Sequence, residues 1–272
     1  MVAAPRLGPR PGRPLRLGVL LQQVRLAQPQ LSAYFGWTEL REDYATGTKL
    51  APTSQVVPML RPCDNDRGLL KDYRDDQNAA DAGAVGFRRA FGKFPSWRDR
   101  QDPDNPCLER IHVLAHSMGA RVLRGALDGW AHDYGPVYGV FRNVFLVAAD
   151  LVNETLDLRG PGRCLSDAAR NVTVYHASDD LALRTSKVTN LRHKIVSRRL
   201  GHSGPEDLSR TAGNVYAVDC DNFNNRIDSP LGHTYFLRDR DDDPSPVFTH
   251  LLHAVTTGRV RADPASRTMV LE

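Results

Sequence analysis

The chain has 272 residues, of which 41% are hydrophobic, and this is enough for one large α/β domain with a substantial core. The 36 lysines and arginines barely exceed the 32 aspartates and glutamates, so the charge does not indicate a nucleic-acid-binding protein. The four cysteines form no CxxC pair, so neither a zinc ribbon nor a disulfide framework is indicated, and we expect a reducing, cytoplasmic location.

Residues 1–16, MVAAPRLGPRPGRPLR, predict a disordered tail because they contain four prolines, four arginines and no acidic residue. An arginine-rich start also occurs in organellar transit peptides, so import into an organelle is an alternative, although the stretch has no serine. No apolar run in the chain reaches the roughly 18 residues of a membrane-spanning helix. We therefore expect no membrane span.

The next two segments predict a helix followed by a strand. VLLQQVRLAQ places Leu20, Val24 and Leu26 at helical spacing. LSAYFGW, at residues 31–37, has the aromatic and small residues of a buried strand.

Residues 38–70 contain several prolines and no sustained period, which predicts an irregular insertion in the domain. A helix follows, because Ala84, Phe87 and Phe91 share one helical face before Pro95 closes the segment.

Four apolar strands then alternate with longer segments, and this regularity indicates the architecture. The strands are RIHVLAH, NVFLVAAD, NVTVYHASDD and NVYAVDC. The first is followed by a helix whose apolar face consists of Val122, Leu123, Ala126, Leu127 and Trp130. A strand with one solvent-exposed face would alternate between polar and apolar residues, whereas these strands are apolar throughout. They therefore predict an α/β fold: a mostly parallel sheet with helices on both faces.

The last helix has the clearest end signals in the chain. Ser245 can cap it, Pro246 suits the first turn, and Gly258 can end it. We therefore expect a single domain over residues 17–261 and a C-terminal tail over residues 262–272.

A five-residue stretch, AHSMG, stands between a predicted strand and a predicted helix and contains the strongest catalytic candidate. Ala115 and Gly119 are small residues two positions before and after Ser117, where a sharp strand-to-helix turn brings backbones close. A serine hydroxyl is a good nucleophile only when a base takes its proton and fixed donors bind the oxyanion. The alternative is that Ser117 only caps the following helix.

Between about residues 31 and 255 the chain resembles a family of α/β hydrolases of unassigned function with a lipase-like elbow. The matching stretches are YFGW, LLKDYRDDQNAA, IHVLAHSMGARVL, VFLVAADL, VTVYHASDDLALRTS and GHTYF. The resemblance implies an α/β-hydrolase fold in which Asp180, directly before LAL, is the acid and His233, in GHTYF, is the base. The chain order Ser117, Asp180, His233 is that of the α/β hydrolases.

Other residues compete for the roles of acid and base. Asp179 is adjacent to Asp180, and Asp150 follows the preceding predicted strand, an alternative position for the acid in this architecture. Asp179 and Asp180 could each instead cap a turn or helix. His202 competes with His233, but it precedes the last predicted strand, whereas the hydrolase order places the base after it.

We expect no metal site and no cofactor. His112 and His116 are four residues apart, which suits a zinc site on a helix, but this segment predicts a strand and no Glu follows His112. The DRDDD stretch at residues 239–243 lacks the glycine of a calcium loop, since Pro244 occupies that position. The basic run from Arg184 to Arg199 is typical of a solvated face, or of a surface that steers an anionic substrate or polymer.

Hydrolases of this kind carry a strand before the elbow that ends in a His-Gly-like turn, and this turn supplies one oxyanion donor. The N–H of Met118, after the nucleophile, supplies the other. No such strand precedes the helix predicted around Leu20 to Leu26, where the Pro/Arg tail stands. We therefore expect the sheet to lack an interior strand, as in an open reading frame that begins too late, and the chain to be aggregation-prone or weakly active.

The sequence therefore predicts a serine hydrolase that cleaves a small-molecule carboxylic ester, or an amide, through an acyl-enzyme. In this interpretation Ser117 attacks, His233 is the base, Asp180 orients it, and Met118 N–H binds the oxyanion. The alternative is an impaired member of the fold that binds a partner through its cleft or basic run. Neither the acyl-chain length nor the oligomeric state follows from the sequence.

Overall fold

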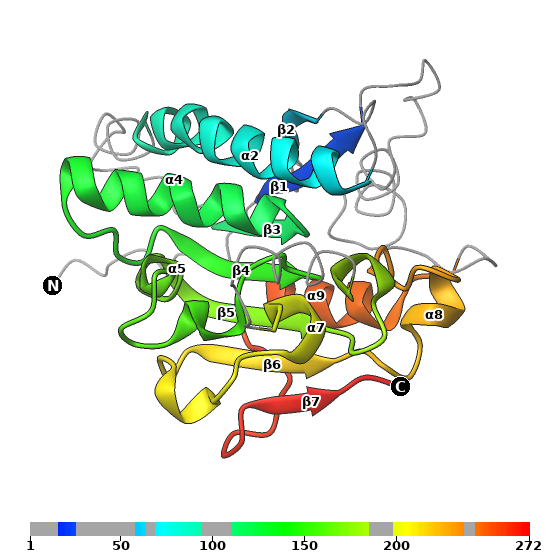
Figure 1. Ribbon diagram of the computed structural model, residues 1–272. Coiled ribbons are helices and arrows are strands. Elements are labelled where there is room, and N and C mark those ends of the chain that lie inside the picture. Colours follow the sequence, from blue (N-terminus) through cyan, green and yellow to red (C-terminus); the bar gives the residue numbers. More distant parts are fainter. Residues whose placement is uncertain (1–15, 26–57, 64–68, 94–109, 185–197, 237–242) are drawn as a thin grey trace, which may run out of the picture.

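Seven strands of the described chain form one sheet in the order β2-β1-β3-β4-β5-β6-β7, with every neighbouring pair parallel (Figure 1). The computed structural model describes residues 16–25, 58–63, 69–93, 110–184, 198–236 and 243–272. Parallel neighbours need long crossover connections, and β3, β4, β5 and β6 are joined by segments of that kind. This sheet confirms the predicted α/β class.

The strands are β1 (Arg16–Arg25), β2 (Pro58–Cys63), β3 (Ile111–His116), β4 (Phe141–Val147), β5 (Ala169–His176), β6 (Val215–Asp219) and β7 (Thr268–Val270). The α-helices are α2 (Leu69–Phe91), α4 (Gly119–Tyr134), α5 (Arg163–Ala168), α7 (Leu200–Ser203), α8 (Asn224–Ile227) and α9 (Pro246–Thr257). The described residues also form two short 3₁₀ turns, η2 (Asn153–Leu156) and η3 (Leu208–Arg210).

The two faces of the sheet carry separate hydrophobic cores. Along β3, Val113 and Ala115 belong to one core and Leu114 to the other, because successive side chains of a strand point to opposite faces. The first core also contains the buried faces of α2 and α4, which lie side by side in Figure 1. The second core contains the buried face of α9. Helices therefore cover both faces of the sheet, as the sequence predicts.

The helices that flank the sheet bury the faces predicted for them. α2 buries Ala84, Phe87 and Phe91. α4 buries the predicted stripe: Val122, Leu123, Ala126, Leu127 and Trp130. The two helices approach closely at Gly125, where an added Cβ would lie 3.0 Å from the Cβ of Ala84. A small residue is therefore needed at this point of contact.

α9 begins and ends at the predicted residues. The Ser245 hydroxyl accepts a hydrogen bond from the N–H of Phe248 at 3.0 Å, and Pro246 stands in the first turn. Gly258 ends the helix with a φ of 72°, in the left-handed region that favours glycine. Local sequence signals are sufficient to define both ends of this helix.

Residues 16–25, which were predicted to end the N-terminal tail and to begin a short helix, instead form the strand β1. β1 pairs with β3 on one side and with β2 on the other, so it lies inside the sheet beside the strand that precedes Ser117. The expectation that the sheet lacks an interior strand here is therefore wrong. An isolated helix of about ten residues is only marginally stable, whereas β1 forms hydrogen-bonded ladders with two neighbours.

Two other boundaries differ from the prediction. β2 lies within residues 38–70, which were expected to be irregular, and β7 lies within residues 262–272, which were expected to be a tail. Both are outermost strands, and each is stabilised by pairing with the strand next to it. The strand predicted at residues 31–37 lies outside the described residues.

A buried polar ladder crosses the sheet beneath α9. His112, Asn143 and Asn171 stand in register on β3, β4 and β5. The Asn143 amide donates to His112 Nδ1 at 2.8 Å and to the Ala254 carbonyl at 3.1 Å. The Asn171 amide donates to Asn143 Oδ1 at 2.8 Å and to the Gly258 carbonyl at 3.3 Å. These bonds attach α9 and its C-cap Gly258 to β4 and β5, and they require an unprotonated Nδ1 on His112.

We predict that His112 makes the fold sensitive to acid. Burial, with the charges of Arg110 and Arg142, lowers the pKa of His112 to about 3 from an ordinary 6.5. Between these values the unfolded chain binds the additional proton, so each unit of falling pH lowers the free energy of unfolding by about 1.4 kcal/mol. Urea unfolding at several pH values measures this dependence. The free energy of unfolding of His112→Gln should change less steeply with pH than that of the wild type. His132→Gln, at an exposed histidine, is the control. An equal pH dependence in His112→Gln and wild type would contradict a neutral His112 in the folded protein.

We also predict that a proline at position 20 destabilises the sheet. Leu20 stands opposite Pro58 of β2 and Leu114 of β3, so its position is interior to the sheet. Proline removes a ladder N–H there, and an unpaired buried carbonyl costs about 1 to 3 kcal/mol. Urea unfolding should show this loss for Leu20→Pro relative to Leu20→Ile, which keeps the N–H. Equal stabilities would place β1 outside the sheet.

Candidate functional site

The carboxyl ends of the strands bring the predicted site residues to one edge of the sheet. Ser117 follows β3, Asp150 follows β4, and Asp179 and Asp180 follow β5. His233 lies on the segment between α8 and α9. Open parallel sheets bind ligands at this edge. The topology therefore places the candidate nucleophile, acids and base where a site is expected.

Ser117 occupies a strained turn between β3 and α4. Its φ is 53°, in the left-handed region, which costs a residue other than glycine roughly 1 to 3 kcal/mol. Its N–H donates to the Val147 carbonyl at 3.0 Å, and its carbonyl accepts the N–H groups of Ala120 and Asp150 at 3.1 Å. The end of β4 and the loop after it therefore hold this turn in place.

The structure does not support the alternative in which Ser117 only caps the helix. The N-cap residue of α4 is Met118, and no side chain caps the helix there. The side chain of Ser117 is half-buried, and its hydroxyl has no hydrogen bond to another described residue. The hydroxyl is therefore free to contact a ligand.

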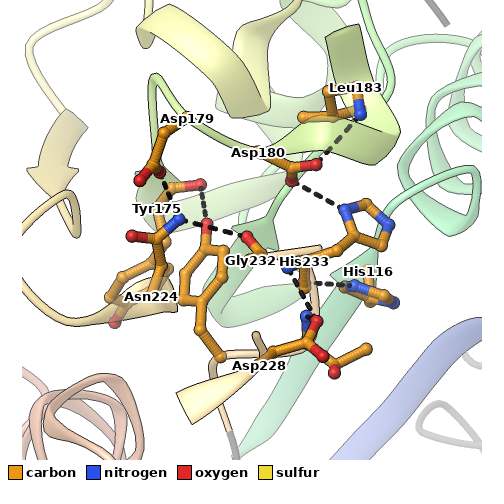
Figure 2. Close-up of polar contacts among 11 residues, drawn as sticks. His116, Tyr175, Asp179, Asp180, Leu183, Asn224, Asp228, Gly232 and His233 are labelled. Carbon is orange, nitrogen blue, oxygen red and sulfur yellow. Dashed lines mark hydrogen bonds and ion pairs between the residues drawn. The ribbon is translucent and has the colours of Figure 1, made fainter. Parts of the chain in front are cut away.

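Asp180 and His233, the acid and base implied by the resemblance, are in direct contact (Figure 2). Asp180 is fully buried; its Oδ2 lies 2.7 Å from His233 Nδ1, and its Oδ1 accepts the Leu183 N–H at 2.9 Å. A carboxylate only accepts hydrogen bonds, so Nδ1 carries the proton. Nε2 of the neutral ring then keeps a free lone pair.

Further hydrogen bonds fix the loop that carries His233. Asp228 Oδ2 accepts the N–H groups of His233 and Thr234 at 2.8 and 2.7 Å. The Leu181 N–H donates to the Leu231 carbonyl at 3.0 Å, which joins this loop to the turn after β5. Asp228 could not be found from the sequence, because its role depends on how the backbone folds back on it.

His116 lies on the other side of His233, as Figure 2 shows. Its Nε2 is 3.1 Å from the His233 carbonyl oxygen, and the centroids of the two rings are 4.7 Å apart. In the sequence, His116 stands out only as a candidate metal ligand. Its contact with the candidate base is a feature that only the structure reveals.

The charges around His233 raise the pKa of its imidazole. Burial is the largest effect and by itself favours the neutral ring. The hydrogen bond and charge of Asp180, with the charges of Asp150 and Asp228, outweigh burial and bring the pKa above its ordinary 6.5. The site therefore stabilises an imidazolium at this position.

Ser117 and His233 are not hydrogen bonded to each other among the described contacts. Such bonds are often long in proteins without substrate and shorten when substrate binds. The N–H of Met118, the expected oxyanion donor, has no acceptor among the described residues. The second donor, expected after an interior strand, would follow β1 in residues 26–57, which lie outside the described part of the chain.

Asp179 and His202, the alternative acid and base, have other neighbours. The Asp179 carboxylate accepts hydrogen bonds from the side-chain amides of Asn224 and Asn225. His202 is on α7 beside His176; burial lowers the pKa of His176, and the charge of His202 adds to this effect. The histidine that contacts Asp180 is therefore His233.

Asp150, the other alternative acid, forms a buried ion pair with Arg199. Arg199 Nε lies 3.1 Å from Asp150 Oδ1, and the two side chains are 5% and 3% exposed. An antiparallel bridge between Val152 and Arg199 holds this segment against the loop after β4. The basic run that ends at Arg199 is thus not one solvated face, although residues 185–197 lie outside the described residues.

The described residues contain no group of three or more His, Cys, Asp or Glu side chains that could hold a metal ion. His112 and His116 stand at opposite ends of β3 and bind Asn143 and the His233 carbonyl. Of the DRDDD stretch, residues 239–242 lie outside the described residues. In the part of the chain that the structure describes, no helix combines the length and apolar character of a membrane-spanning segment.

We predict that the charge of Asp180 controls the pKa of His233. In Asp180→Asn the imidazole loses its principal stabilising charge, so its pKa should fall well below the wild-type value. Titration of His233 followed by NMR measures this shift. Asp179→Asn is the matched control, since this adjacent carboxylate binds two amides instead of the imidazole. Equal shifts in the two variants would contradict the assignment of Asp180 as the partner.

Comparison with known proteins gives one family match. A family model described as alpha/beta hydrolase of unknown function (DUF900) matches residues 71–241. The match covers more than half of the 272-residue chain and includes Ser117, Asp180 and His233. Searches of curated proteins and of solved structures found no match. The family match agrees with the parallel sheet and with the position of the site, and the chain belongs to this family of alpha/beta hydrolases of unknown function.

Proposed function

We propose that the protein is a serine hydrolase that cleaves a carboxylic ester, or an amide, through an acyl-enzyme. The observation that carries the proposal is the 2.7 Å hydrogen bond between Asp180 and His233, at the sheet edge where Ser117 has its positive φ. A nucleophile on a strained turn, an imidazole and a buried carboxylate are the parts of a hydrolase triad.

In the first step, Ser117 Oγ attacks the carbonyl carbon of the substrate while its proton passes to His233 Nε2. The Nδ1–H of His233 stays bonded to Asp180, whose charge stabilises the imidazolium. The tetrahedral intermediate then loses its leaving group as the C–O bond breaks. His233 gives the proton to the oxygen that leaves, and an acyl ester remains on Ser117.

In the second step, His233 takes a proton from water as the water oxygen attacks the acyl carbon. The bond between the acyl carbon and Ser117 Oγ then breaks as His233 returns that proton to Oγ, and the carboxylic acid is released. In both steps the intermediate carries a negative oxygen. The Met118 N–H, which has no acceptor among the described residues, would donate to this oxygen.

The proposed substrate is a small-molecule ester or acyl compound, and the proposed chemistry needs no cofactor. Nucleophile, base and acid all come from side chains of this chain. The described thiols, Cys164 and Cys220, are both free, which fits the reducing cytoplasm that we propose as the place of action.

We predict that a fluorophosphonate probe labels Ser117. The hydroxyl oxygen would form a bond to phosphorus with loss of fluoride, and peptide mapping by mass spectrometry would locate the adduct. Ser117→Ala should lose the label and about 10⁶-fold of any esterase kcat, with unchanged circular dichroism. Ser178→Ala is the control, because this exposed serine at the same sheet edge is bonded to Asp221 and should not affect labelling.

The alternative function is a non-catalytic member of the family that binds a partner. One observation favours it: Ser117 and His233 are not hydrogen bonded in the structure. A folded wild-type protein that remains unlabelled at saturating probe would support this alternative and overturn the hydrolase proposal.

A further inference from the structure

His116 joins the turn at Ser117 to the loop that carries His233. It is the last residue of β3, directly precedes Ser117 and is 4% exposed. Its Nε2 contacts the His233 carbonyl oxygen (Figure 2), and the two atoms are 3.1 Å apart. A carbonyl oxygen only accepts, so Nε2 carries the hydrogen and donates it. The backbone of the candidate base is therefore bonded to the residue before the candidate nucleophile.

Ring contacts restrict how His116 can move. Its imidazole lies 4.7 Å from that of His233, at 52° between the planes, and 4.9 Å from the ring of Phe236, at 37°. The register of β3 places His116 opposite Val147 of β4. The sheet therefore fixes the backbone of His116, and two aromatic neighbours fix its ring.

His116 makes these contacts as a neutral ring. Burial disfavours its charged form and the charge of His233 adds to this effect, so the pKa of His116 is lowered to about 3. A second cation beside His233 would oppose the imidazolium that the proposed reaction forms. A neutral donor holds the His233 carbonyl without that penalty.

We propose that His116 is a positioning residue that sets the reach of His233 Nε2 to Ser117 Oγ. Among the described residues, three groups bind His233: Asp228 binds its N–H, Asp180 binds Nδ1, and His116 binds its carbonyl oxygen. Of these three, only His116 is covalently bonded to Ser117, so it connects the backbone of His233 to the residue that carries the nucleophile. The expected effect on the labelling rate rests on the proposed function, whereas the positioning of the His233 ring does not.

The test compares three variants by their rates of labelling with a fluorophosphonate probe. His116→Phe keeps a buried ring and removes the donor, so kinact should fall by about 10²-fold, the cost of a misplacement of about 1 Å, while KI stays near wild type. His116→Gln carries an amide that can donate, and should recover part of kinact. His112→Gln, at the other end of the same buried strand, should keep the wild-type kinact.

A wild-type rate in His116→Phe, or an equal loss in His112→Gln, would overturn the positioning role. Should His116→Phe fail to fold by circular dichroism, His116→Leu replaces it as the variant without a donor: a reduced kinact with unchanged KI supports the proposal, and a wild-type kinact overturns it.

A second measurement separates this inference from the proposed function. If wild-type protein is not labelled, the hydrolase proposal fails, but NMR still reports on the ring of His233. The Nδ1–H proton of His233 should exchange with water faster in His116→Phe than in wild type, because the loop is less restrained. Unchanged exchange would overturn the positioning role whatever the activity.

Discussion

The parallel pairing of β3 between β1 and β4 is the constraint on which the site depends. A strand bonded on both sides cannot shift its register without breaking two ladders, so the position of Ser117 beyond its end is fixed. The strained φ of Ser117 persists because the Val147 carbonyl and the Asp150 N–H, both from the β4 side, bind its peptide groups. The order of the strands thus determines the geometry of the turn.

Each of three aspartates near the site binds a different partner. Asp150 pairs with Arg199, Asp179 accepts two side-chain amides, and Asp180 binds His233. A buried carboxylate without a partner is costly, and these pairings leave one carboxylate facing the imidazole. The charge of Asp150 still helps to raise the pKa of His233, so the ion pair with Arg199 does not remove its influence.

Much of the fold and part of the site follow from local sequence patterns. Apolar runs identify β3 to β6, and a cap at Ser245 with a glycine at position 258 defines α9. Small residues two positions from Ser117 indicate the turn, which has the positive φ that such a turn needs. The contact between Asp180 and His233 was implied by the resemblance to known hydrolases. The local pattern by itself does not rank Asp180 above Asp179, because both follow the same strand; that ranking came from the resemblance.

By itself, the sequence determined the elements whose signals lie within a few neighbouring residues: apolar strands, amphipathic helices, helix ends and the turn at Ser117. Only the tertiary structure decided that residues 16–25 form an interior strand, since that choice depends on ladders to β2 and β3. Only it decided that His116 contacts His233, which is 117 residues away in the chain. The physical reason is the same in both cases: hydrogen bonds between distant segments form only when the whole sheet assembles, and no local pattern encodes them.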